Sequence, residues 1–263
     1  MWGTWTIYTT IARRLVFLGT QGCLEMEQGL SQFAPLPEVQ FDDLETFEHA
    51  KSKPLSVTLA VSRQRKILGF EVSSMPAKGP LAEIGRKRYG FRPDGRSQAL
   101  RNLLNRIRPR VAERAIVWSD ENPRYPKPVA RIFPHARHET VKGRRGCVTG
   151  QGELKRGGFD PLYSLNHTCA MLRANVNRLV RKTWCTTKKA ENLAHHLAIY
   201  ANYHNSVLIR DGENDFLSPR PCEGERCLAP GDRGKSPNEG EHARRVLLAS
   251  ETDPGLKDFF YPQ

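Results

Sequence analysis

The chain has 263 residues, enough for one sizeable hydrophobic core or two small ones. Its 41 lysine and arginine residues outnumber its 28 aspartate and glutamate residues, and the first 210 residues carry 34 of the bases and only 17 of the acids. A positive charge of this size favours a polyanionic partner such as nucleic acid, although ribosomal and membrane-surface proteins share it. The six cysteines lack paired CxxC spacing, which argues against a zinc ribbon or a dense disulfide framework and favours reduced thiols.

The first stretch, residues 1–38, contains several glycines and closes on two prolines, so we expect a poorly structured leader. Trp2–Leu18 is too short and too polar to span a membrane, and its two arginines lie inside it rather than ahead of an apolar region. We therefore expect no targeting segment, no membrane partner and a cytoplasmic location.

Three β-rich runs follow and predict an antiparallel meander. Val39–Glu48 alternates apolar residues with acids, while Pro54–Val61 and Ile67–Val72 are joined by a polar hairpin connection. Residues 74–96 are rich in glycine, proline and basic residues, which predicts a loop with one short helical turn near Leu81–Ile84. Such a loop either supplies phosphate contacts or is a solvated surface excursion.

A helix and a buried strand come next. Ser97–Val111 begins on an N-cap type residue and places its leucines at helical spacing. Ala115–Tyr125, AIVWSDENPRY, is a short apolar run that ends in Asp120 and breaks at once into a turn. This pattern is typical of a core strand, so Asp120 is expected at the strand's end, beside solvent. There it either caps the turn or binds a metal, and partners elsewhere in the chain decide which.

Beyond Asp120, four prolines predict a stiff connection to a weak strand near Glu139–Val141. Leu165–Lys182 and Ala190–Asn205 then show helical periodicity. The following tail is rich in glycine, proline and charge, which is typical of disorder. The chain is therefore expected to comprise a leader at 1–38, a catalytic domain at 39–208 and a disordered acidic tail at 209–263.

The order of these elements is that of the ribonuclease H-like fold, the α/β fold of retroviral integrases, with a mixed sheet and flanking helices. In that topology the first and fourth strands are neighbours, so Asp42 and Asp120 are expected to face each other. Two close carboxylates repel, and a hard divalent cation that takes oxygen ligands from both makes the arrangement tolerable. This geometry suits two-metal phosphoryl transfer.

Three segments resemble the catalytic core of bacterial insertion-sequence transposases of the DDE superfamily, of the short type with a zinc-ribbon and helix-turn-helix leader. They are FDDLETFEHAKSK, VWSDENPRY and LNHTCAMLRANVNRLVRKTWCTTK, within about residues 39–206. The resemblance implies that Asp42 and Asp120 are catalytic acids that bind Mg²⁺ or Mn²⁺ in a two-ion site. The family's third acid, a glutamate, falls on Asn166, and its basic partner seven residues later falls on Arg173.

The substitution at Asn166 leaves the activity open. An amide oxygen can ligate magnesium but brings no charge to offset the cation. The neighbouring His167 is either a substitute ligand or an ordinary helix histidine, and histidine prefers softer metals. The family's leader, with its cysteine pairs, has no match ahead of Asp42, so we expect a truncated core.

The sequence is therefore consistent with three functions. The leading one is a DNA transposase that cleaves and joins phosphodiesters of double-stranded DNA at mobile-element ends, with a homodimer on the DNA allowed. The second is a catalytically inactive DNA-binding remnant. The third, an unrelated basic RNA-binding protein, predicts no approach of Asp42 to Asp120.

Overall fold

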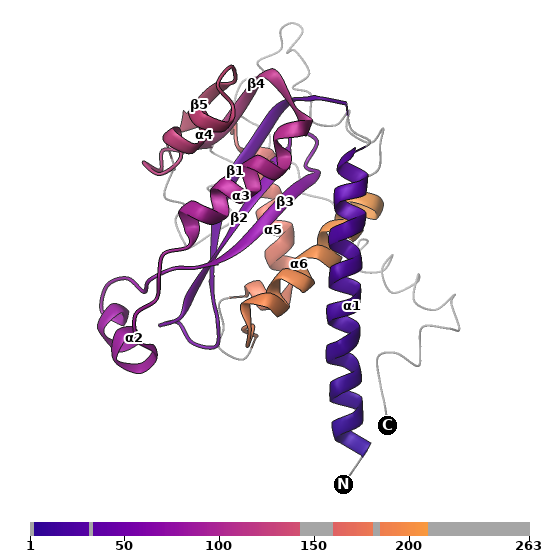
Figure 1. Ribbon diagram of the computed structural model, residues 1–263, viewed down its shortest axis with the longest axis vertical. Helices are drawn as coiled ribbons and strands as arrows, with labels where there is room; N and C mark the ends of the chain where they lie inside the picture. The colour runs from indigo at the N-terminus through magenta and orange to yellow at the C-terminus, as the bar shows by residue number, and fades with distance from the viewer. Residues whose placement is uncertain (1–2, 32–33, 143–159, 181–184, 210–263) are drawn as a thin grey trace, which may run out of the picture. The chain divides into compact units, whose positions relative to one another are not determined.

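The computed structural model describes residues 3–31, 34–142, 160–180 and 185–209, and a five-stranded sheet lies at its centre (Figure 1). The strand order is β3-β2-β1-β4-β5. β1 and β3 pair antiparallel with β2, whereas β4 pairs parallel with both β1 and β5. The strands are β1 Leu36–Phe47, β2 Pro54–Ser62, β3 Ile67–Ser74, β4 Val111–Asp120 and β5 Arg137–Val141.

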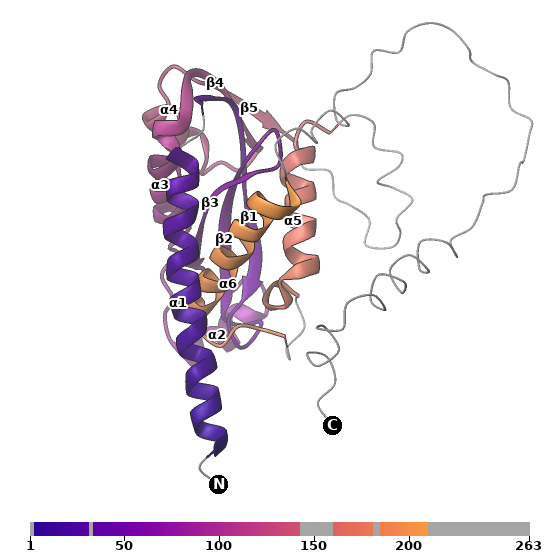
Figure 2. The ribbon, with the colours of Figure 1, turned by 90° about the vertical axis from the view of Figure 1, so that its right-hand side faces the viewer.

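Helices cover both faces of the sheet. Figure 2 shows the strands with α3 on one side of them and α5 on the other. α3 and α4 pack on one face, α5 and α6 pack on the other, and α1 lies along α6. The helices are α1 Gly3–Ser31, α2 Leu81–Tyr89, α3 Arg96–Ile107, α4 Pro126–Ile132, α5 Tyr163–Asn175 and α6 Ala190–Tyr203. Short helical turns follow three of them, at η1 Arg108–Arg110, η2 Asn177–Leu179 and η3 His204–Leu208.

The mixed sheet with this strand order and helices on both faces is the ribonuclease H-like fold that the sequence predicts. The antiparallel meander is confirmed, as are α3, the strand that ends in Asp120 and the last helix. β4 can join β1 in parallel because α3 supplies the crossover connection that parallel neighbours need.

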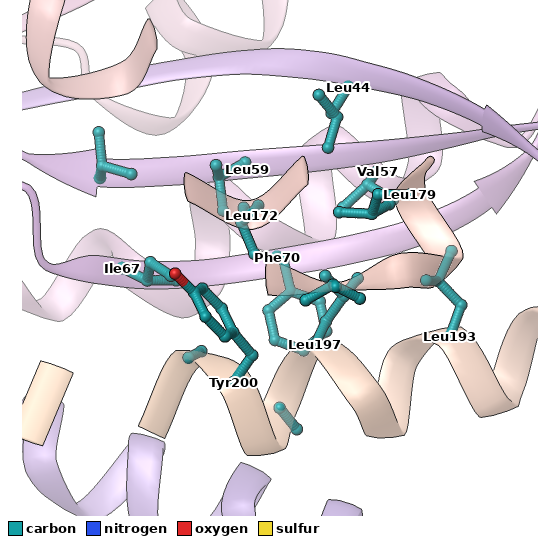
Figure 3. Packing of buried hydrophobic residues seen from close by; sticks show 14 of the residues in the cluster. Leu44, Val57, Leu59, Ile67, Phe70, Leu172, Leu179, Leu193, Leu197 and Tyr200 are labelled. Carbon is teal, nitrogen blue, oxygen red and sulfur yellow. The ribbon is translucent and has the colours of Figure 1, made fainter. Parts of the chain in front are cut away.

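Alternation along the strands builds two separate cores, because successive side chains of a strand point to opposite faces. Figure 3 shows the core beneath α5 and α6, where Leu59 and Phe70 from the sheet meet Leu172, Leu197 and Tyr200 from the helices. The other core lies beneath α3 and α4 and includes Phe41, Leu68, Leu100, Leu104 and Ile132. Helices therefore cover both faces of the sheet.

The leader prediction is wrong for residues 3–31, which form the helix α1. Two of the glycines that suggested an unstructured segment, Gly19 and Gly22, are contact points with α6 instead. A Cβ added at Gly22 would lie 3.2 Å from the backbone of Ala198 in α6, so glycine permits the close approach of the two helices. Met26 and Leu30 complete the packing with 3% and 5% of their surfaces exposed.

Three other segments differ from expectation. α2 has nine residues rather than one turn. The proline-rich connection after Asp120 contains the helix α4, because its prolines fall in the first turn, where the backbone N–H groups need no partner within the helix. α5 ends at Asn175, since Val176 adopts an extended conformation, so the helix expected to run to Lys182 is shorter.

The predicted tail, 209–263, lies outside the described residues except for Ile209. None of the helices within the described part of the chain combines the length and apolar character that crossing a membrane requires.

The α1–α6 contact predicts opposite effects for two glycine substitutions in one helix. Gly19→Ala would overlap the Cβ atom of His195, which cannot swing away from the backbone of α6, and we expect it to lower the free energy of unfolding by about 1–3 kcal/mol. Gly29→Ala meets no atom within 4 Å and should raise that free energy by up to about 1 kcal/mol. Urea unfolding of both variants measures this, and equal effects would show that α1 does not pack on α6 through Gly19.

Candidate metal centre

The parallel pairing of β1 with β4 brings two carboxylates together. Gln40 pairs with Trp118 in the register, and two residues farther along both strands stand Asp42 and Asp120. Side chains two residues apart point to the same face of a sheet, here the face covered by α5. Gln40 confirms this direction, since its Oε1 accepts a hydrogen bond of 3.0 Å from the backbone N–H of Leu165 in α5.

Electrostatics link the two acids. Burial and the negative charge of Asp120 raise the pKa of Asp42 to about 6, although the Asp43 N–H and the Tyr125 hydroxyl oppose the shift by hydrogen bonding to the charged form. Burial also raises the pKa of Asp120, against a backbone hydrogen bond from Asn122 at 3.0 Å. A cation between the carboxylates would relieve the part of the Asp42 shift that comes from the charge of Asp120.

Each carboxylate is held by one of its oxygens. Oδ1 of Asp42 accepts from the Asp43 N–H at 2.7 Å and from the Tyr125 hydroxyl at 3.1 Å. Oδ1 of Asp120 accepts from the Asn122 N–H. Among the residues that the structure describes, neither Oδ2 atom receives a hydrogen bond. The two Oδ2 atoms are therefore the oxygens that a metal could take as ligands.

Asp43 is occupied in a different way. Its Oδ1 accepts a hydrogen bond of 2.6 Å from Thr58, and its Oδ2 pairs with Arg124 at 3.0 Å. Both oxygens therefore have partners, and Asp43 serves to fix the turn after β4. This agrees with the choice of Asp42 over Asp43 as the candidate ligand.

Tyr125 is a site residue that the sequence analysis did not single out. Only 1% of its surface is exposed, its ring meets Phe41 edge-on at 4.9 Å between centroids, and its hydroxyl reaches Asp42. Burial and the nearby carboxylates raise its pKa far above the ordinary range, so it remains a hydrogen-bond donor. The signal was its position at the end of the turn that begins at Asp120.

The two predicted residues on α5 are both exposed. Asn166 donates a hydrogen bond of 2.8 Å from its amide nitrogen to Asp160, which leaves its carbonyl oxygen for another partner. Arg173 lies in the last turn of α5. Between them on the same side of the helix stands Cys169, whose pKa is raised to about 12 by burial and by the charge of Asp42, and lowered in part by Arg173. Cys169 is thus a residue of α5 on which the charge of Asp42 acts.

His167 faces elsewhere. Its ring contacts Tyr163 at 5.6 Å between centroids, and burial together with the charge of Arg65 lowers its pKa. Arg65 belongs to the turn between β2 and β3, away from Asp120. The reading as an ordinary helix histidine therefore describes it better than that of a substitute ligand.

The donor set is small. Within the described ranges, no group of three or more His, Cys, Asp or Glu side chains is placed to hold a metal. Two carboxylates nevertheless fit a hard cation such as Mg²⁺, which in proteins often takes one or two carboxylates, substrate phosphates and water. The arrangement can hold such an ion when further oxygens come from an amide or from a substrate.

No protein-family model and no curated protein matches the sequence. Among solved structures, the chain is similar to the Mos1 transposase catalytic domain with raltegravir and Mg, at 12% identity and a TM-score of 0.30, over 72% of this chain and 92% of that one. It is also similar to the Mos1 mariner transposase catalytic domain, at 12% identity and a TM-score of 0.28, over 72% and 94% of the two chains. A third similarity is to the simian T-cell lymphotropic virus intasome in complex with the PP2A regulatory subunit B56 gamma, at 16% identity and a TM-score of 0.29, over 76% and 62%. The strand order, and not these superpositions, identifies the fold.

The burial of Asp42 and its repulsion by Asp120 predict an unusual pH dependence of stability. Because the pKa of Asp42 is raised in the folded protein, its contribution to stability is complete below its ordinary value of 3.8 and is lost as the pH rises through about 6. Asp42→Asn keeps the acceptor for Tyr125 and removes the charge, so at pH 7 it should raise the free energy of unfolding by about 1–3 kcal/mol. The gain should vanish below about pH 4.

Asp43→Asn is the matched control, because it removes the partner of Arg124 and should lower stability at pH 7. Urea unfolding in EDTA between pH 3.5 and 8 measures both variants. A loss of stability in Asp42→Asn at pH 7 would contradict the repulsion between Asp42 and Asp120.

Proposed function

We propose that the chain is a transposase-like protein that binds double-stranded DNA and cleaves and joins its phosphodiesters at the ends of a mobile element. One observation carries the proposal: Asp42 and Asp120 stand side by side at neighbouring parallel strands, with raised pKa values and one oxygen of each carboxylate without a partner in the described chain. The ribonuclease H-like fold and the positive charge of the first 210 residues support the same conclusion.

Asp42, Asp120 and the carbonyl oxygen of Asn166 would hold Mg²⁺ or Mn²⁺. The bound ions would activate a water or 3′-hydroxyl and stabilise the leaving oxygen of the phosphodiester. Tyr125 and the Asp43 N–H fix the Asp42 carboxylate through Oδ1, which keeps Oδ2 directed for ligation. Arg173, exposed near the end of α5, would bind a DNA phosphate. A cytoplasmic location and a homodimer on the DNA remain predictions.

A second candidate function is DNA binding without catalysis. Two features favour it: Asn166 brings no negative charge, and within the described residues no third His, Cys, Asp or Glu side chain joins the pair in a group placed to hold a metal. This protein would bind DNA through its basic surface and show no saturable Mg²⁺ site.

Strand cleavage tests the leading function. In a nicking and strand-transfer assay with Mg²⁺ or Mn²⁺, Asp120→Ala should lower the rate by at least about a hundredfold, since even groups that only support metal ligands cost 10- to 100-fold when removed. Glu121→Ala is the matched control, because this exposed neighbour acts on Asp120 through its charge and is not one of the proposed ligands. Equal activity of wild type and Asp120→Ala would end the proposal.

Metal binding tests the role of Asn166. Mg²⁺ should raise the thermal midpoint of the wild type, and Asn166→Glu, which supplies the acid of the family, should shift the half-saturating Mg²⁺ concentration down about tenfold. Asn166→Ala should raise that concentration, whereas Cys169→Ser should leave it nearly unchanged, because a thiol is a poor ligand for a hard cation. A larger effect from Cys169→Ser than from Asn166→Ala would remove Asn166 from the site, and no Mg²⁺ effect on the wild type would favour the DNA-binding remnant.

A further inference from the structure

α2 and the turn after it expose both apolar and basic side chains. Figure 1 shows this helix at the lower left, beyond the ends of the strands. Phe91 has 85% of its surface exposed, and Ile84 and Leu81 have 54% and 38% exposed. The basic residues Arg86, Lys87 and Arg88 are exposed on the same helix. We call these six residues the α2 surface.

The exposure of Phe91 is built into an anchored turn. Gly90, with a φ of 73°, ends α2 in a conformation that favours glycine. On the other side of Phe91, the Arg92 guanidinium bonds to Glu48 at 3.4 Å and to the Pro54 carbonyl at 3.3 Å. The structure thus holds the Phe91 ring in solvent, at a hydrophobic cost that a ligand would relieve.

α2 itself is held against the turn between β1 and β2. A Cβ added at Gly85 would lie 2.8 Å from the Ser52 carbonyl oxygen, so only glycine permits this approach. The Lys53 ammonium lies 5.3 Å from the centroid of the Tyr89 ring on the same helix. The α2 surface therefore has a fixed orientation on the sheet.

The charges of the α2 surface differ from those around it. Lys78, Arg92 and Arg96 each pair with a carboxylate. Arg86 and Lys87 make no ion pair within the described residues, and Arg88 stacks its guanidinium on the Tyr89 ring at 5.6 Å. Basic side chains without a carboxylate partner in the described chain, on the same segment as an exposed aromatic ring, fit a ligand that carries both phosphates and flat apolar faces. A nucleic-acid strand with an unstacked nucleobase has this chemistry.

The position of α2 also suits DNA that occupies the carboxylate pair. β1 continues for five residues from Asp42 to Phe47, which is about 17 Å at 3.3 Å per residue. α2 packs on the turn that follows. A strand bound at Asp42 would therefore meet α2 roughly five nucleotides away, at 3.4 Å per nucleotide.

We propose that the α2 surface is a second DNA contact, in which Arg86, Lys87 and Arg88 bind phosphates and Phe91 stacks on an unpaired or distorted base. The choice of DNA as the nucleic acid rests on the proposed function. The contact requires no metal and no turnover, because stacking and phosphate binding use only side chains of this turn.

The test is fluorescence anisotropy of the full chain in EDTA with a single-stranded 20-nucleotide probe and with the fully paired duplex. Phe91→Ala should weaken single-strand binding at least about fivefold, with a smaller effect on the duplex, and Phe91→Trp should retain the affinity. Phe17→Ala is the matched control, since Phe17 is a 68% exposed phenylalanine on α1. It should leave the affinity unchanged.

The charges have their own test. Arg86→Ala with Lys87→Ala should reduce the slope of log K against log salt by about 1.4 for single strands, at about 0.7 for each phosphate contact. The pair Arg13→Ala with Arg14→Ala removes equal charge from α1 and should leave the slope unchanged. Circular dichroism confirms that each variant has the wild-type thermal midpoint.

Equal DNA affinity of wild type and Phe91→Ala would overturn the proposal. If that variant also loses binding to phosphatidylserine vesicles, the surface is assigned to a lipid headgroup layer instead. Failure here is distinct from failure of the proposed function. Cleavage depends on Asp120 and metal, whereas this binding is measured without metal and should persist in Asp120→Ala.

Discussion

The parallel pairing of β1 with β4 is the contact on which the candidate site depends. It sets the register that aligns Asp42 with Asp120, two residues beyond the pair Gln40 and Trp118. The same strand anchors α5, because Gln40 bonds to the Leu165 N–H and to the Pro161 carbonyl. A shift of one residue in this register would turn Asp42 to the opposite face and separate it from both Asp120 and α5.

Two carboxylates close together repel each other, and hydrogen-bond donors around Asp42 offset part of this repulsion. The Tyr125 hydroxyl and the Asp43 N–H stabilise the charged form of Asp42, yet the pKa of this acid still rises to about 6. The adjacent Asp43 pairs with Arg124 instead. Neighbouring carboxylates of similar sequence context therefore differ in bonding: both oxygens of Asp43 have partners, whereas Oδ2 of Asp42 receives no hydrogen bond from the described residues.

Much of this could be predicted from residue patterns. The meander, α3, the strand ending in Asp120 and the fold class follow from alternation, helical spacing and element order, which are local signals. The surroundings of the acids could not be predicted, because they come from residues far away in the chain. Tyr125, which donates a hydrogen bond to Asp42, is 83 positions away, and Cys169, whose pKa is raised by the charge of Asp42, is 127 positions away. The sequence pattern does not predict α1, because glycines in a sequence resemble helix breakers. Only the contact of Gly19 and Gly22 with α6 explains their presence in this helix.

The sequence by itself determined which side chains are present, their spacing and the order of the strands, and hence the pair Asp42 and Asp120 as a candidate. Only the tertiary structure decided which carboxylate oxygens accept hydrogen bonds, that Asn166 bonds to Asp160, and that Phe91 is held in solvent on an anchored turn. The physical reason is that hydrogen bonds, burial and charge repulsion depend on distances between residues remote in the chain. Local periodicity carries no information about those distances.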